Sequence, residues 1–336
     1  MTPLNYFTEE EVESNGYIIE EKQAPIFAPN PLYGTCGRTD TVVVCGNKTI
    51  CIYWQKGTQR IPYRDLLLAT NWIGKYILWG GYIMDSDATQ LAHRSHTGQD
   101  GITRKWIIEA NVELCRGYGG AAYNGRSWCA LSQDNLKKLT NTVRYDQPTI
   151  PQVIFYEVGR CLYNLKLDEV LDWQMSEPSE YGYWTLGFSG AMTALIPELI
   201  GCKMDYYGTD AAGFRADRLH DLATYVNNAG YNFANTWSQL YLPWNSSQSI
   251  NDVMSGLLIY LFDNYGGATF LYQLFYNLCL QPDTHRKDQR EERAMNFVRS
   301  CYTAAQNIGG SYKANEMYYY FYTTLRWTFI GPVSRL

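Results

Sequence analysis

The five residues Tyr156-Glu157-Val158-Gly159-Arg160 carry the side chains best suited to chemistry in this chain of 336 residues. On a helix, Tyr156 and Arg160 are four residues apart and share a face, and Glu157 lies beside them within reach of Arg160 or Cys161. A carboxylate in this setting can act as a general acid or base. It can also pair with the guanidinium, because a buried carboxylate needs a partner. The pattern predicts either an acid–base residue or a structural ion pair.

The four histidines do not form a metal set by their spacing. His93 and His96 are close in the sequence, but no cysteine or third histidine accompanies them, so we expect solvated loop side chains. His220 falls on a predicted helix, and His285 falls in a polar turn. We therefore expect no bound metal and no cofactor.

A change of periodicity near residue 133 divides the chain into two predicted regions. Residues 41–45 and 49–54 are β-branched and aromatic runs separated by a short turn, which predicts a hairpin. Residues 76–84, interrupted by Gly80-Gly81, predict a further strand with a bulge or turn. Beyond residue 133 the apolar spacing is helical. Helices are expected over residues 153–165, 184–194, 214–228, 250–265, 269–280, 288–307 and 315–327.

Local signals support two of these helices. Ser249 and Asp252 form an S-x-x-D capping box, and Gly266-Gly267 ends the helix that follows it. Around Glu157, apolar side chains such as Ile154, Val158 and Leu162 give the helix a wide buried face. The predicted fold class is α+β, with a β-rich N-terminal region over residues 1–132 and a mainly helical region over residues 133–336.

This order of elements resembles the gluzincin type of zinc metallopeptidase. It comprises a β-rich half, a glycine-rich stretch over residues 115–125, the helix with Glu157 and a helical half. Residues 255–281, with the turn at Tyr265-Gly266-Gly267, are similar to the helix pair that follows the active-site helix in proteins of that kind. The second region is therefore identified as zincin-like.

The family motif is H-E-x-x-H, in which two histidines bind zinc and the glutamate polarises a zinc-bound water. That role maps onto Glu157, whereas the two ligand positions map onto Tyr156 and Arg160. Neither side chain offers an imidazole nitrogen, and a guanidinium repels a dication. The family's third ligand has no matching motif, and the carboxylates in that part of the chain are Glu177, Glu180 and Glu198.

Composition excludes several functional classes. The net charge is −5 and the pI is about 5.5, so no basic surface is expected for nucleic acid. No apolar run reaches the roughly 20 residues of a membrane span, and residues 1–16 are acidic rather than signal-like. Nine cysteines without a secretory signal favour free thiols in a reducing compartment; Cys36, Cys45 and Cys51 lack C-x-x-C spacing. We expect an intracellular, cytoplasmic protein.

Aromatic content is the remaining signal. The chain has 29 Tyr, 10 Trp and 12 Phe, which is compatible either with an aromatic core or with contact surfaces for self-association. We expect a non-catalytic zincin-like protein that acts in binding or self-assembly. One alternative is a hydrolase or metallopeptidase with an atypical centre that uses Glu157. Another is a structural protein of a capsid, shell or in-vivo crystal.

Overall fold

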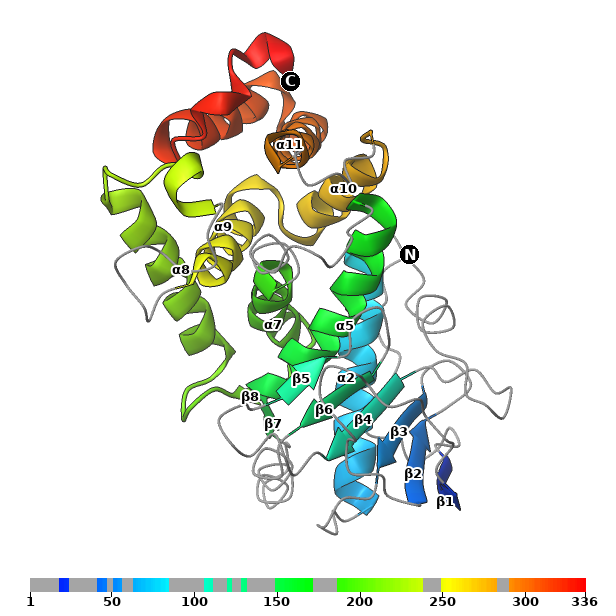
Figure 1. The fold of residues 1–336 in the computed structure, drawn as a ribbon. Helices are drawn as coiled ribbons and strands as arrows, with labels where there is room; N and C mark the ends of the chain where they lie inside the picture. Colours follow the sequence, from blue (N-terminus) through cyan, green and yellow to red (C-terminus); the bar gives the residue numbers. More distant parts are fainter. Residues whose placement is uncertain are drawn as a thin grey trace. The chain divides into compact units, whose positions relative to one another are not determined.

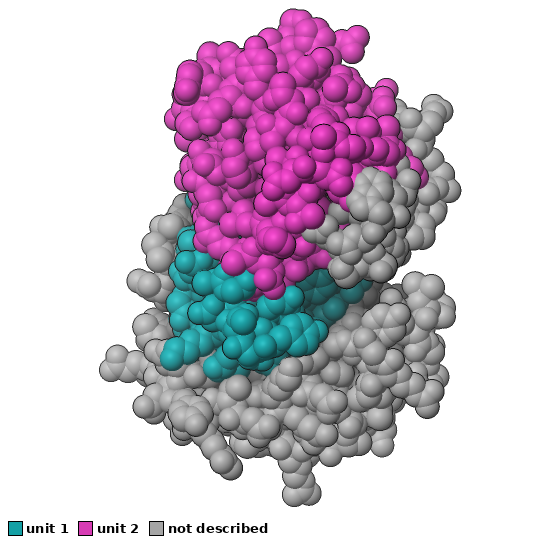
Figure 2. Space-filling view, turned by 90° about the vertical axis from the view of Figure 1, so that its left-hand side faces the viewer, with its two compact units in different colours: residues 1–82, 86–165, 195–213 teal, residues 83–85, 166–194, 214–336 magenta. Residues whose placement is uncertain are grey.

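The computed structural model describes residues 18–23, 41–46, 51–55, 63–84, 106–110, 120–122, 128–131, 149–171, 186–237, 249–282 and 290–336. The chain divides into two compact units, coloured separately in Figure 2. Unit 1 comprises Met1–Tyr82, Ser86–Leu165 and Leu195–Gly213, and unit 2 comprises Ile83–Asp85, Lys166–Ala194 and Phe214–Leu336. Each unit is built from separate stretches of sequence. The predicted division near residue 132 stays a prediction.

Helices dominate the described part of the chain, so the predicted fold class, with a β-rich N-terminal half, is wrong. Helix α2, Tyr63–Ile83, spans 21 residues of that half. It includes most of residues 76–84, which were expected to form a strand. The aromatic and β-branched residues there favour strands only weakly, and packing overrides this preference. A Cβ on Gly80 would lie 2.4 Å from Cδ2 of Leu162, so the glycine allows α2 to approach the helix that carries Leu162.

Six of the strands that the structure describes in unit 1 are short and form a mixed sheet (Figure 1). Its order is β1-β2-β3-β4-β6-β5. The predicted hairpin is confirmed, because β2 and β3 are antiparallel with Val44 opposite Tyr53. Strands β3 and β4 are parallel and α2 lies between them in the sequence, as a helical crossover requires. The strand bounds are β1 Ile18–Gln23, β2 Thr41–Gly46, β3 Cys51–Gln55, β4 Trp106–Ala110, β5 Gly120–Ala122 and β6 Trp128–Leu131.

A second, two-stranded sheet precedes the helix that carries Glu157. Strand β7, Thr149–Pro151, pairs in parallel with β8, Lys203–Asp205, and leads directly into α5, Gln152–Leu171. The apolar face predicted for α5 is present, with Ile154, Phe155, Val158 and Leu162 all buried. The ring of Phe155 contacts that of Tyr76 on α2, with centroids 5.0 Å apart. Helix α5 is thus held between the end of a strand and the apolar side of α2.

The remaining helices contribute most of unit 2. They are α7 Gly187–Leu199, α8 Ala211–Asn227, α9 Ile250–Tyr265, α10 Gly267–Cys279 and α11 Arg290–Tyr319, and the start of α8 and the end of α7 belong to unit 1. The capping box is confirmed, since the Asp252 amide donates to Oγ of Ser249 at 3.4 Å. Gly266, with φ of 123°, ends α9 as predicted, because this left-handed region favours glycine.

Helix α11 has a kink at Gly310, where φ is 72° and ψ is −174°. The sequence predicted two helices in this part of the chain, and the kink falls in the predicted gap between them. Beyond Tyr319 the backbone continues as a π-helical turn and two 3-10 turns, Tyr320–Thr324, Thr328–Ile330 and Val333–Arg335. The kink and the π-helical turn therefore bound a short straight segment of α11.

Many of the aromatic residues form the core of unit 2. Phe188 on α7 contacts Phe275 on α10 edge-on, with ring centroids 5.1 Å apart. Phe297 and Phe321 extend this contact toward the C-terminal turns. There Trp327 meets Trp237 at 4.9 Å. Edge-to-face pairs of this kind add to the stability that area burial provides.

One arginine joins the C-terminal turns to α8. The guanidinium of Arg326 donates to the carbonyl oxygens of Val226, Tyr225 and Asn228 at 3.2, 3.0 and 3.0 Å, and also to that of Tyr231. Carbonyls in the last turn of a helix have no partner within the helix. Arg326 supplies partners at the end of α8, and its φ of 57° shows that the backbone adopts an uncommon conformation there.

Candidate functional site

The candidate site is the first half of α5, where Tyr156, Glu157 and Arg160 follow strand β7. Glu157 lies on the buried side of the helix and is 3% exposed, whereas Tyr156 and Arg160 are half-buried. The predicted contact is present: Nη1 of Arg160 donates to Oε2 of Glu157 at 3.0 Å. The structure therefore brings Glu157 and Arg160 together on one turn.

The surroundings of Glu157 set its charge behaviour. Burial raises the pKa of the Glu157 carboxyl above its ordinary value, and the nearby guanidinium of Arg160 opposes this shift both by its charge and by its hydrogen bond. Desolvation is the larger of these influences. A carboxyl with a raised pKa exchanges protons closer to neutral pH, which is one requirement for a general acid.

The two positions that the sequence comparison predicted to correspond to zinc ligands, Tyr156 and Arg160, carry a phenol and a guanidinium. Among the described residues, no group of three or more histidine, cysteine, aspartate and glutamate side chains is placed to hold a metal ion. Glu198 is exposed on α7, and His220 is exposed on α8. Glu177, Glu180, His93, His96 and His285 lie outside the described residues, as do the structures around Cys36 and most of the glycine-rich stretch.

Two described thiols and one serine of α7 are in unreactive settings, whereas the Cys279 side chain is exposed. Cys202 and Cys301 are free and buried, and burial raises the pKa of both thiols. A raised pKa reduces the thiolate fraction, so neither group is a nucleophile at neutral pH. Ser189 is fully buried inside α7, and its carbonyl accepts a bond from Thr193 Oγ1 at 2.7 Å. A hydroxyl in this helix interior is not accessible to a substrate.

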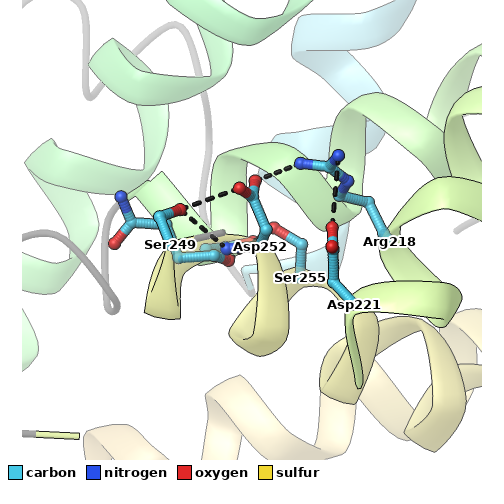
Figure 3. Close-up of polar contacts among 7 residues, drawn as sticks. Arg218, Asp221, Ser249, Asp252 and Ser255 are labelled. Carbon is cyan, nitrogen blue, oxygen red and sulfur yellow. Dashed lines mark hydrogen bonds and ion pairs between the residues drawn. The ribbon is translucent and has the colours of Figure 1, made fainter. Parts of the chain in front are cut away.

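A second polar cluster lies between α8 and α9 (Figure 3). Arg218 binds Asp252 and, at 3.2 Å, Asp221. Ser249 Oγ donates to Oδ2 of Asp252 at 2.8 Å, which couples the cap of α9 to α8. The helices pass closely here, since a Cβ on Gly256 would lie 2.2 Å from the Arg218 carbonyl oxygen. The cluster therefore joins two helices through paired charges.

Sequence reasoning missed Arg218 and Arg326, two arginines that bond to distant parts of unit 2. Arg218 bonds to a residue 34 positions away, and Arg326 reaches carbonyls about 100 positions away. Local spacing carries no signal for such distant partners. The one part of the Arg218 cluster that the sequence predicted is the helix cap formed by Ser249 and Asp252.

Comparison with known proteins adds no function. No protein-family model matches the chain, and a search of curated proteins found no significant match. Two solved structures are similar: a functionally unknown conserved protein from Bacillus anthracis str. Ames and a mutant of such a protein from the same source. The first has a TM-score of 0.46 at 11% identity and covers 80% of this chain and 49% of its own. The second has a TM-score of 0.45 at 12% identity, and the match covers 82% of this chain and 51% of that protein's chain. This chain spans about half the length of each.

Among the described residues, no helix has the length and apolar character needed to cross a membrane.

Proposed function

We propose that this chain is a non-catalytic zincin-like protein that acts in binding or self-assembly. The pairing of Glu157 with Arg160 carries the proposal. In a zincin, the glutamate must reach a water bound to zinc. Here its carboxylate binds a guanidinium that occupies the position of the second imidazole.

The charges argue in the same direction. A dication beside Arg160 would be repelled by the guanidinium, and Tyr156 has no imidazole to compensate. Glu157 is buried and needs a cation or donor nearby, and Arg160 meets this need from the same helix. The pair thus gives the buried carboxylate a structural role without a metal.

The binding or assembly part of the proposal is supported by exposed aromatic and aliphatic side chains. In unit 2, Leu280 is 66% exposed, Tyr312 79% and Tyr319 59%. Tyrosine is enriched at protein contact surfaces because it combines a large apolar ring with a polar tip. A role in a capsid, shell or in-vivo crystal would be one form of such assembly.

A hydrolase with an atypical centre is the second candidate, and the raised pKa of Glu157 is the observation that favours it. Elemental analysis of the purified, zinc-supplemented protein separates the two. We expect less than stoichiometric zinc and no Glu157-dependent turnover on a panel of peptide and ester substrates. One tightly held zinc per chain, or turnover that disappears in Glu157→Gln while the melting temperature stays normal, would overturn the proposal.

A further inference from the structure

The straight segment of α11 between Gly310 and Tyr320 presents four exposed residues on one side. Tyr312, Asn315, Glu316 and Tyr319 are all exposed, and they are named here the α11 stripe. Their separations of three, one and three residues place them on one face of a helix. The two tyrosines lie about 10 Å apart along the axis, from a rise of about 1.5 Å per residue.

The two ends of the stripe are alike and its two middle residues are complementary. A tyrosine stands at each end, and one amide and one carboxylate stand in the middle. Oδ1 of Asn315 accepts a bond from the Tyr302 hydroxyl at 3.2 Å, which leaves the Asn315 NH₂ group to donate elsewhere. Glu316 can only accept when it is ionised. The middle of the stripe therefore combines one donor with one acceptor.

Neighbouring contacts hold the stripe in place. The Tyr318 hydroxyl donates to the Gly331 carbonyl at 2.6 Å, and the ring of Tyr318 meets that of Tyr319 edge-on at 5.2 Å. Lys313 pairs with Glu316 at 3.1 Å. Side chains ordered before binding lose less entropy on association.

We propose that the α11 stripe binds the same stripe of a second copy of this chain, with the two helices antiparallel. Around a two-fold axis between positions 315 and 316, Tyr312 lies opposite Tyr319 of the partner subunit, and Asn315 opposite Glu316 of the partner subunit. Each contact then occurs twice, as an isologous interface requires. This inference rests on the proposed role in self-assembly and assigns that role to a surface.

Complementarity between the amide donor of Asn315 and the carboxylate acceptor of Glu316 favours this occupant and this orientation. The antiparallel register sets the Asn315 donor against the partner's carboxylate, whereas a parallel pair would bring the two Glu316 carboxylates together. Like charges at such distances destabilise an interface. Tyr276 on α10 and Leu280, which follows the end of that helix, are also exposed, but the aliphatic Leu280 side chain offers neither a donor nor an acceptor.

The decisive experiment measures the dimer dissociation constant by sedimentation equilibrium for the full chain and a matched pair of variants. Asn315→Lys and Asn315→Glu place long side chains of opposite charge at the same exposed position. We expect the dissociation constant of the Asn315→Lys dimer to be lower than that of the Asn315→Glu dimer by about tenfold or more. The contact between position 315 and Glu316 of the partner subunit occurs twice in each dimer.

Tyr312→Ala and Tyr276→Ala provide the second comparison. Loss of Tyr312 should weaken the dimer about tenfold or more, whereas Tyr276→Ala, outside the stripe, should leave it unchanged. Circular dichroism checks that each variant is folded. If the wild-type chain and all four variants associate with the same affinity, the α11 stripe is not the interface, whereas the proposed self-assembly still holds. A wild-type chain that stays monomeric throughout the dilution series would overturn both.

Discussion

Helices α5 and α11 each contain an ion pair between residues three positions apart, with almost the same separation. Arg160 and Glu157 are 3.0 Å apart, and Lys313 and Glu316 are 3.1 Å apart. Their exposure differs: the side chains are 15% and 4% exposed in α5, against 39% and 41% in α11. Two pairs with the same spacing therefore differ in environment: one is buried and the other is exposed to water.

The comparison shows that burial, rather than spacing, decides what such a pair contributes. In water, the attraction is screened and two flexible side chains must be ordered, so a helical pair contributes only about 0.3–0.5 kcal/mol. In the interior, removal of one partner leaves a charge without compensation. The α5 pair is accordingly the one whose separate residues should matter to folding.

The largest expected effect is that of Arg160→Met, which leaves the buried Glu157 carboxylate without its cation. We expect the free energy of unfolding at neutral pH to fall by about 3 kcal/mol, the lower end for breaking a buried pair, because Arg160 retains some contact with water. Urea denaturation measures the loss. The loss should shrink at acidic pH, where Glu157 is protonated and carries no charge.

The double variant Glu157→Gln with Arg160→Met provides the control. Because no buried charge remains, it should recover part of the stability lost in Arg160→Met alone. A single variant that unfolds within about 0.5 kcal/mol of wild type would contradict the assignment, since changes of that size are typical of surface positions.

A smaller effect is expected for Glu157→Gln, which keeps the shape but removes the charge. We expect a loss of about 1–3 kcal/mol, the range for an impaired buried hydrogen bond. Burial raises the pKa of Glu157 above its ordinary value near 4.5, so the folded state binds more protons than the unfolded state in this window. The free energy of unfolding of wild type should therefore exceed that of the variant by less and less as the pH rises from about 4.5 through the raised pKa.

Thermal unfolding of both proteins across that pH range tests the sign. If the stability difference between wild type and the variant grows with pH, Arg160 lowers the pKa of Glu157 more than burial raises it.

The smallest effect is expected for Glu316→Gln in the exposed pair of α11. The free energy of unfolding should change by less than about 0.5 kcal/mol, and salt should reduce the difference because the pair is solvated. The measurement belongs at concentrations where the chain is monomeric, so that association does not enter. Lys313→Met should behave similarly, and a loss above about 1 kcal/mol in either variant would remove the contrast with α5.

The sequence predicted the features that short-range spacing controls. The cap at Ser249, the glycine stop at Gly266 and the contact between Glu157 and Arg160 each involve residues within a few positions, and all are present. The hairpin of β2 and β3 also follows from adjacent runs and a short turn. Local chemistry suffices for such features because the partners are fixed by helix and turn geometry.

Prediction failed where a distant partner decides the conformation. Tyr76 and its neighbours favour a strand by composition, yet they form α2, whose Gly80 lies against Leu162. The bonds of Arg218 and Arg326 connect positions far apart in the sequence. These contacts depend on how helices pack, and the pattern of single residues does not contain that arrangement.

The clamp formed by Arg326 bears on how unit 2 is completed during synthesis. The Val226 carbonyl of α8 accepts from a guanidinium that the ribosome adds 100 residues later, and the Tyr225 hydroxyl donates to the Leu325 carbonyl, 2.9 Å away in the folded protein. Until residues 326 and 327 have emerged from the exit tunnel, α8 lacks its bonds to the Arg326 guanidinium, and the ring of Trp237 lacks its contact with that of Trp327. The contacts that join α8 to residues 325–327 therefore form only after these residues have been synthesised, and we expect a chain shortened before residue 325 to expose aromatic surface that Trp327 covers.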